Sequence, residues 1–308
     1  MQSKEIAILI PCYNESISIK QVIQDFKHEL PNAKIYVYDN NSSDDTANIA
    51  RACGAIVRYE KLQGKGSVVR SMFRDIEADI YVMVDGDNTY PASFVHKLIQ
   101  PINEGGVDMV IGDRHTSGDY KKENKRALHH FGNHLVKSLI NYLFDAKLED
   151  IMSGYRAFSK RFVKSMPINS AGFEIETEMS IHSLDKRLHV EEIAISYKDR
   201  EEGSFSKLNT ISDGVKVLKT IFWLFKDYKP LAFFTTFSFF FFLLSLLAGL
   251  PVIIEFVQTA YITKIPSAIL AVGLMLISII SLFVGFILDT IVKQHKENFE
   301  LHILSSTR

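Results

Sequence analysis

The sequence predicts an α/β domain, with a mostly parallel sheet flanked by helices, followed by two helices that cross a membrane. Up to residue 197, short apolar runs alternate with helical patterns of about a dozen residues, as in a parallel sheet. Residues 231–254 and 267–288 are almost entirely apolar, and each run could cross roughly 30 Å of hydrocarbon as a helix. The composition of this chain of 308 residues therefore changes near residue 230.

The individual elements follow from the apolar runs and from the residues that end them. Pro11 closes the first run, and Gly54 stops a helical pattern that begins at Ala47. The segment 150–158 is rich in loop residues. We expect strands at residues 6–10, 35–38, 55–58, 80–84, 109–111 and 190–197, and helices at residues 16–30, 47–52, 67–76, 91–103, 126–144 and 173–187.

The charges that flank the two apolar runs predict the orientation of the membrane segment. Several lysines precede the first run and two follow the second, whereas the short connection holds only Lys264. By the positive-inside rule, both termini face the cytoplasm, and residues 293–308 form a cytoplasmic tail. Residues 211–229 carry an apolar stripe opposite lysines, which predicts an amphipathic helix at the membrane interface. We expect no cleavable signal peptide, because the N-terminus is short, charged and followed directly by a soluble pattern.

The overall composition gives no sign of nucleic-acid binding or of a cysteine-based site. The formal net charge is −1, and no basic face with interleaved aromatic residues emerges in the soluble part. Cys12 and Cys53 are too few for a disulfide framework or a zinc site. We expect both to be small packing residues in a reducing compartment.

Two aspartates, Asp85 and Asp87, end the apolar run at residues 80–84. A solvated turn is one interpretation of this pattern, but the position at the end of a buried strand, before Thr89, favours a metal site. Hard carboxylate oxygens suit a divalent cation and the diphosphate that it carries. Other polar clusters also follow predicted strands, and ligands of parallel sheets bind beyond the carboxyl ends of the strands. The sequence therefore predicts one shared site at this edge.

Five motifs follow one another along the first 210 residues. They are Pro11-Cys12-Tyr13-Asn14-Glu15, Asp39 with Asp44-Asp45-Thr46, Gly64-Lys65-Gly66, Asp85-Gly86-Asp87 and Ser153-Gly154-Tyr155-Arg156. Together they resemble the motifs of family 2 glycosyltransferases, which have the GT-A fold, a Rossmann-like α/β domain. The resemblance is closest to dolichyl-phosphate mannose synthases and bacterial polyprenyl-phosphate glycosyltransferases. It implies a glycosyltransferase domain at residues 1–210, then the interfacial helix, and two membrane helices within residues 230–292.

The resemblance implies a bound divalent cation, Mg²⁺ or Mn²⁺, which neutralises the diphosphate leaving group. Asp87 is the first choice as a direct metal ligand. Asp85 is expected close to the ribose or the metal, and Thr89 is a weaker metal candidate.

The resemblance also implies a nucleotide pocket. Asp39 is assigned to the nucleotide base or ribose, although it could merely cap the next helix. Lys65 would reach the nucleotide, unless it is a plain loop residue between two glycines. Asn14 and Glu15 could be ordinary capping residues. The family nevertheless uses this loop as a wall of the pocket, which here comprises Pro11, Tyr13, Asn14 and Glu15.

A polyprenyl phosphate acceptor would require cations, because it brings an anionic nucleophile to an anionic donor. Arginine suits phosphate through its bidentate fork. The phosphate-binding arginines of the family match Arg114 and Arg200 best. Arg126 is a further candidate for the acceptor phosphate, but it could equally belong to a solvated basic loop.

Asp150 stands where related inverting transferases place a general base. A phosphate monoester is already anionic near neutral pH, so that role is less needed. We expect Asp150 to position the acceptor or the arginines, although it could simply cap local backbone. Arg156 is expected to pair with a carboxylate, and Glu174, Glu176 and Glu178 to favour the positive end of a helix dipole.

These features predict an inverting, metal-dependent transfer of one sugar to undecaprenyl or another polyprenyl phosphate, at the cytoplasmic face of a bacterial plasma membrane. Resemblance favours UDP-glucose as donor, with UDP-N-acetylglucosamine and GDP-mannose as alternatives. A processive polysaccharide synthase is disfavoured, because only two spans are available to form a channel. A non-catalytic scaffold or sugar-nucleotide sensor is a further alternative. Bacterial relatives of this branch suggest a homotetramer.

Overall fold

A computed structural model describes residues 4–116, 127–172, 174–198, 219, 222–223 and 225–306 of the chain. The chain divides into two compact units, residues 1–215 and residues 216–308, and each is described by itself. Most of the expected interfacial helix at residues 211–229 lies outside the described residues. Of those that are described, residues 219, 222–223 and 225–228 are helical, and Lys229 forms a bend.

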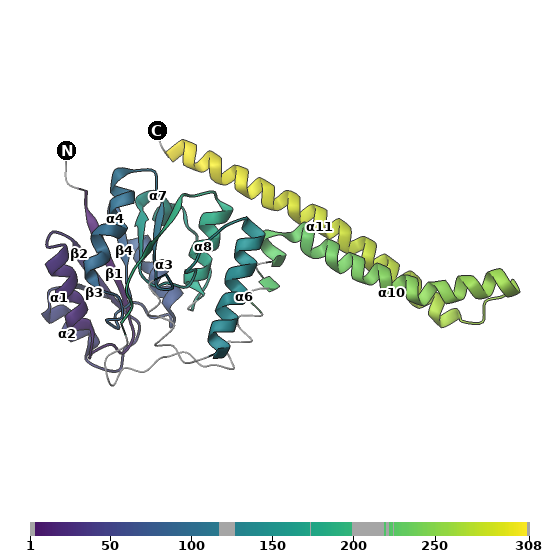
Figure 1. Ribbon diagram of the computed structural model, residues 1–308, viewed down its shortest axis with the longest axis horizontal. Coiled ribbons are helices and arrows are strands. Elements are labelled where there is room, and N and C mark those ends of the chain that lie inside the picture. The colour runs from purple at the N-terminus through teal and green to yellow at the C-terminus, as the bar shows by residue number, and fades with distance from the viewer. Residues whose placement is uncertain are drawn as a thin grey trace. The chain divides into compact units, whose positions relative to one another are not determined.

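The first unit alternates strands and helices, with helices on both faces of one sheet (Figure 1). The prediction of an α/β fold is confirmed. Its elements are β1 (Ile6–Cys12), α1 (Ile19–Glu29), β2 (Lys34–Asp39), α2 (Thr46–Ala52), β3 (Ile56–Tyr59), α3 (Lys65–Asp75), β4 (Ile80–Met83), the 3₁₀ turn η1 (Ala92–Phe94), α4 (Val95–Glu104), β5 (Met109–Asp113), α6 (Ala127–Phe144), β6 (Arg156–Ser159), α7 (Lys160–Ser165), α8 (Ile175–Asp185) and β7 (Val190–Ala194).

The sheet has seven strands in the order β3-β2-β1-β4-β6-β5-β7. It is mostly parallel, and only β6 runs antiparallel to its neighbours β4 and β5. The expectation of a loop over residues 150–158 is wrong for residues 156–158, which belong to β6. This short strand is stabilised by pairing on both sides, with Arg156 opposite Met83 of β4 and Ile111 of β5. Because β6 is antiparallel, the segment before it lies at the carboxyl ends of β4 and β5.

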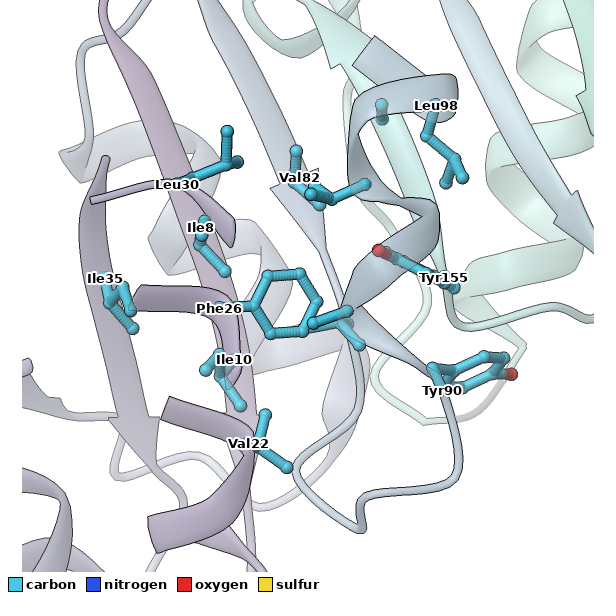
Figure 2. Close-up of a cluster of buried hydrophobic side chains, with 14 of the residues drawn as sticks. Ile8, Ile10, Val22, Phe26, Leu30, Ile35, Val82, Tyr90, Leu98 and Tyr155 are labelled. Carbon is cyan, nitrogen blue, oxygen red and sulfur yellow. The ribbon is translucent and has the colours of Figure 1, made fainter. Parts of the chain in front are cut away.

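The hydrophobic core between the sheet and α1 holds these strand ends in place (Figure 2). Ile8 and Ile10 of β1 are fully buried, and Phe26 of α1 is 1% exposed. Phe26 packs edge to face on Tyr155, with ring centroids 6.0 Å apart and an interplanar angle of 83°. Aromatic pairs in this geometry stabilise a core by about 0.5–1.5 kcal/mol beyond the area they bury. The packing fixes Tyr155, directly before β6, against the first helix.

The second unit is a pair of long helices, α10 (Pro230–Thr259) and α11 (Ile265–Ser306), which run side by side (Figure 1). Both are long and apolar enough to cross a membrane, with mean hydropathies of 2.5 and 2.7 over their most apolar windows. The two predicted spans lie within them, although α11 continues through most of the expected tail. Polar contacts join the helices: Ser238 Oγ lies 3.0 Å from Ser278 Oγ, and Ser245 donates to the Ala271 carbonyl at 2.8 Å.

Candidate active site

Loops that follow β1, β2 and β4 turn sharply at the carboxyl edge of the sheet. Each contains an asparagine in the left-handed backbone conformation, with φ of 54° at Asn14, 62° at Asn41 and 60° at Asn88. Asparagine adopts this conformation more readily than most residues with a side chain. These three positions allow the chain to reverse direction directly after each strand, so that the polar residues around them gather at one edge.

The loops after β1 and β2 are tied together by hydrogen bonds. The Asn14 backbone N–H donates to Ser42 Oγ at 2.9 Å, and Asn14 Oδ1 accepts from the Ser43 N–H at 2.7 Å. The Glu15 N–H donates to the Thr46 hydroxyl at 2.8 Å. Asn14 therefore has a clear structural task in joining the loops. Its place in a pocket wall, and that of Glu15, stays a prediction.

Asp39 is the last residue of β2 and pairs with Cys12 of β1 in the sheet. In the sequence, Cys12 stands between the two predicted wall residues, Pro11 and Tyr13. Pro11 is half-buried within β1, whereas Tyr13 is 38% exposed. The Asp39 side chain is buried, and its Oδ2 accepts from the Ser42 N–H at 3.2 Å. Within the described part of the chain, its Oδ1 has no hydrogen-bond partner. A buried acceptor in this state is unfavourable by roughly 1–3 kcal/mol, so this oxygen is suited to a donor group of a ligand.

Lys65 opens α3, and its ammonium lies between two carboxylates. The Nζ atom is 2.5 Å from Asp85 Oδ1 and 2.5 Å from Glu176 Oε1. The side chains of Lys65 and Glu176 are only 9% and 6% exposed. Burial by itself lowers the pKa of Lys65, but the two carboxylates outweigh it and raise the pKa well above its ordinary value. The ammonium therefore stays charged.

The two glycines beside Lys65 explain how this ion pair forms. The Gly66 N–H donates to the Ala171 carbonyl at 3.0 Å, and a Cβ on Gly66 would lie 2.1 Å from the Ser170 carbonyl oxygen. Gly64 has a φ of 127°, and a Cβ there would lie 2.1 Å from the Ala171 oxygen. Only glycine permits such a backbone approach. The contact brings the segment before α8, and with it Glu176, to the start of α3.

Asp85 and Asp87 follow β4 and have different surroundings. Asp87 is buried, and its Oδ1 accepts from the Thr89 hydroxyl at 2.7 Å and from the Thr89 N–H at 3.3 Å. Asp85 faces the segment before β6, where a Cβ on Gly154 would lie 2.4 Å from Asp85 Oδ2. The Gly154 N–H donates to the Tyr90 hydroxyl at 3.0 Å. The glycine of the Ser153-Gly154-Tyr155-Arg156 motif thus leaves room for the Asp85 carboxylate.

The two aspartates can supply part of a divalent cation site. Among the described residues, no group of three or more His, Cys, Asp or Glu side chains could hold a metal ion. Mg²⁺ is commonly held by one or two carboxylates together with substrate phosphate oxygens. Asp85 and Asp87 fit this second kind of site. The Thr89 hydroxyl orients Asp87, and its role as a metal ligand stays a prediction.

Arg114 directly follows β5, and Asp150 holds it. Arg114 donates from Nε to Asp150 Oδ2 at 2.7 Å, from a terminal nitrogen to Oδ1 at 2.8 Å, and from its backbone N–H to Oδ2 at 3.1 Å. Burial raises the pKa of Asp150, but the charge and hydrogen bonds of Arg114 outweigh it and hold the pKa below its ordinary value. The guanidinium also lies over the Tyr197 ring, 5.6 Å from its centroid. This geometry makes Asp150 an anchor for the arginine.

Glu192, in β7, is a site residue that the sequence did not reveal. Its two carboxylate oxygens accept from the backbone N–H groups of Glu149 and Asp150, at 2.8 and 2.9 Å. Burial raises the pKa of Glu192, and these two hydrogen bonds oppose that rise. Glu176 was also missed, because a glutamate at a helix start has an adequate explanation in the helix dipole. In both cases the partner comes from a distant segment, and no local pattern signals it.

Three predicted arginines have different outcomes. Arg126 and Arg200 lie outside the described residues. Arg156 is fully buried, and burial lowers its pKa to about 10. The expectation that it pairs with a carboxylate is wrong for the described residues: it donates to the carbonyls of Ser153 at 2.8 Å and Ile151 at 2.6 Å. Arg156 therefore fixes the segment between Asp150 and β6 rather than an acidic partner.

Comparisons with known proteins agree with the fold. Residues 7–166 match the family described as glycosyl transferase family 2. The glycosyltransferase AglJ of Haloferax volcanii is 31% identical over 299 residues, which is 96% of each chain. The dolichyl-phosphate hexose transferase of Haloferax volcanii is 28% identical over 218 residues, covering 70% of this chain and 92% of that protein.

A solved structure supports the same fold. Glucosyl-3-phosphoglycerate synthase from Mycobacterium tuberculosis, in complex with Mn²⁺, uridine diphosphate and phosphoglyceric acid, superposes with a TM-score of 0.60 at 21% identity. The match covers 73% of this chain and 78% of that one. The first unit therefore has the GT-A fold of a glycosyltransferase. The chain belongs to glycosyltransferase family 2.

Proposed function

We propose that this glycosyltransferase moves one sugar from a nucleotide diphosphate donor to a polyprenyl phosphate at the cytoplasmic face of the membrane, with inversion at the sugar carbon. UDP-glucose is the favoured donor, and UDP-N-acetylglucosamine and GDP-mannose are the alternatives. The buried Arg114–Asp150 pair carries this proposal, because it places a fixed cation at the carboxyl edge that holds the donor-side aspartates.

The donor side rests on three carboxylates at that edge. Asp39 has a buried oxygen suited to an N–H or O–H group of a nucleotide. Asp85 and Asp87 would hold Mg²⁺ or Mn²⁺ together with the donor diphosphate. The cation would neutralise the charge that develops on the leaving nucleoside diphosphate. The solved GT-A neighbour that contains Mn²⁺ is consistent with this choice of ion.

The acceptor side rests on Arg114. A phosphate oxygen of the lipid would attack the sugar carbon, and the bond from that carbon to the diphosphate would break. The attacking oxygen is already ionised, so no base has to remove a proton. Asp150 would act by holding Arg114 in a bidentate geometry. The lowered pKa of Asp150 agrees with this role, because it keeps the carboxylate ionised. Arg126 and Arg200 remain predicted additional contacts for the phosphate groups.

The lipid acceptor is supported by the relatives and by the second unit. One relative is named a dolichyl-phosphate hexose transferase, and another, from Pyrococcus furiosus, a dolichol-phosphate mannosyltransferase. Helices α10 and α11 would keep the enzyme in the same membrane as the acceptor tail. A homotetramer, which the resemblance suggests, stays a prediction that light scattering of the detergent-solubilised protein would test.

A transfer assay tests this function. Purified protein in detergent would receive radiolabelled UDP-glucose, polyprenyl phosphate and Mn²⁺, and we expect a labelled product that partitions into organic solvent and is labile to mild acid. Asp87→Ala should abolish the product, whereas Glu104→Ala, a change at an exposed carboxylate at the end of α4, should not. Full metal-dependent activity of Asp87→Ala would refute the site. A water-soluble product in place of the lipid would refute the acceptor, and a panel of nucleotide sugars identifies the donor.

A further inference from the structure

Lys65 forms an ion pair with Asp85, one of the two aspartates that would bind a metal ion in the proposed function. Its ammonium contacts Asp85 Oδ1 at 2.5 Å, so a divalent cation that approaches this carboxylate is repelled by a positive charge already in contact with it. The same ammonium contacts Glu176 at 2.5 Å on another side. Among Asp85, Asp87 and Glu176, the lysine cancels one of three negative charges. The site is thus already supplied with a cation from the chain itself.

The backbone keeps Lys65 at this place. Residue 65 lies between two glycines whose close contacts with the segment before α8 fix the start of α3. Its side chain is nearly buried, and a buried ammonium that loses every anionic partner is strongly unfavourable. Glu176, equally buried, is a partner that Lys65 can retain when its contact with Asp85 breaks. Contact with Glu176 alone would therefore keep Lys65 paired without any movement of the helix.

We propose that Lys65 is a resident counter-ion that guards Asp85 until the donor arrives, and that Glu176 is the positioning residue that retains Lys65 when the metal takes Asp85. This inference rests on the proposed function of Asp85. It predicts that the nucleotide-free protein binds divalent cations weakly. The cation then enters together with the nucleotide diphosphate, because the negative charge of the diphosphate compensates the second cation in the site.

Metal binding to the nucleotide-free protein tests the proposal without any turnover. The full chain in detergent would be titrated with Mn²⁺, and free Mn²⁺ would be followed by electron paramagnetic resonance. Lys65→Gln should bind Mn²⁺ about tenfold or more tightly than the unchanged protein, because it removes a cation in direct contact with Asp85. Glu176→Gln should bind it about tenfold more weakly, because Lys65 then pairs with Asp85 alone.

Two further variants separate this effect from damage to the fold and from general charge. In the double variant Lys65→Gln/Glu176→Gln no lysine remains for Glu176 to hold, so it should bind Mn²⁺ about as tightly as Lys65→Gln, whereas an effect of net charge alone would return it to the unchanged affinity. Arg70→Gln loses the same charge from an exposed position of α3 and should leave the affinity unchanged. Misfolding would weaken binding in every variant, so tighter binding by Lys65→Gln cannot come from damage to the fold.

The outcomes also separate this proposal from the proposed function. Unchanged or weaker Mn²⁺ binding by Lys65→Gln overturns the guard role, whether or not the enzyme makes a lipid product. An equal shift in Arg70→Gln overturns it as well, because the effect would then be long-range charge alone. Opposite shifts in the two single variants, together with a double variant that binds as tightly as Lys65→Gln, support it even if the acceptor of the unchanged enzyme proves to be something other than a lipid phosphate.

Discussion

Arg114 is held in place by a succession of contacts that begins on a different strand. Half-buried Glu192 of β7 accepts from the backbone N–H groups of Glu149 and Asp150, and the buried Asp150 carboxylate then holds the guanidinium of Arg114. Glu192 therefore acts on Arg114 only through Asp150, and it is a positioning residue.

Replacement of Glu192 by glutamine tests this succession. The amide keeps one acceptor but turns an NH₂ group toward one of the two backbone N–H donors, which is unfavourable by about 1–3 kcal/mol. If Arg114 binds the acceptor, kcat/KM for the lipid phosphate should fall about tenfold, while KM for the nucleotide sugar stays unchanged. Glu191→Gln, on the exposed face of the same strand, is the matched control. Equal losses for donor and acceptor would contradict the assignment.

The sequence predicts some site residues much better than others. Asp39, Asp85 and Asp87 can be proposed from local pattern, because each directly follows an apolar strand whose carboxyl end must lie at the ligand edge. The ion pair of Lys65 with Glu176 and the contact of Glu192 with Asp150 cannot be proposed from any local pattern. They depend on which distant segments the glycine contacts and the antiparallel strand bring together, and these are properties of tertiary packing.

At the scale of elements, α8 contains a buried histidine that makes stability depend on pH. His182 is 7% exposed, and burial, followed by the charge of Lys186, lowers its pKa to about 4, whereas Asp185 opposes the shift. In the unfolded chain the pKa is near 6.5. Between these two values the unfolded chain binds the additional proton, so stability is present above about pH 6.5 and is lost as the pH falls toward 4.

Replacement of His182 by glutamine should remove this part of the pH dependence. Between pH 7 and pH 5, His182 should lower the free energy of unfolding by about 2 kcal/mol. The measurement is the thermal unfolding of the protein and the variant in detergent at pH 7, 6 and 5, followed by circular dichroism. The difference between the two melting temperatures should change across this range. Parallel curves would show that His182 does not titrate as described.

Most elements were predictable because their apolar periodicity is local. Strand β6 shows the limit of such predictions. Residues 156–159 form too short a run to be distinguished from the loop before them. Their strand conformation comes from pairing with β4 and β5 on both sides. The length of α11 was also underestimated, because its helix continues beyond the apolar run into polar sequence. An apolar run marks the part of a helix in the membrane and does not show where the helix ends.

At the scale of the whole molecule, the two long helices decide which side of the membrane the enzyme faces. Helix α11 has 42 residues and so spans about 63 Å at 1.5 Å per residue, about twice the thickness of the hydrocarbon. If α11 crosses a membrane, its polar C-terminal part extends out of the bilayer. The lysines near both outer ends predict that this part and the glycosyltransferase domain share the cytoplasm.

Cysteine labelling in intact cells tests this topology. In a variant with Cys12 and Cys53 replaced by serine, a cysteine at Thr263 in the connection should react with a membrane-impermeant maleimide added outside. A cysteine at Ser305, near the end of α11, should react only after the membrane is opened. The reverse pattern would place the domain on the other side, where cytoplasmic nucleotide sugars do not reach it.

Mass spectrometry of the lipid product tests the central claim most directly. Membranes containing the enzyme would be incubated with a defined polyprenyl phosphate, Mn²⁺ and unlabelled nucleotide sugar. The masses of the extracted lipids would then be measured by mass spectrometry. The account predicts one new species, heavier than the polyprenyl phosphate by a single sugar residue and absent with Asp87→Ala. A ladder of longer glycans, or a complete absence of sugar on the lipid while the donor is consumed, would contradict it.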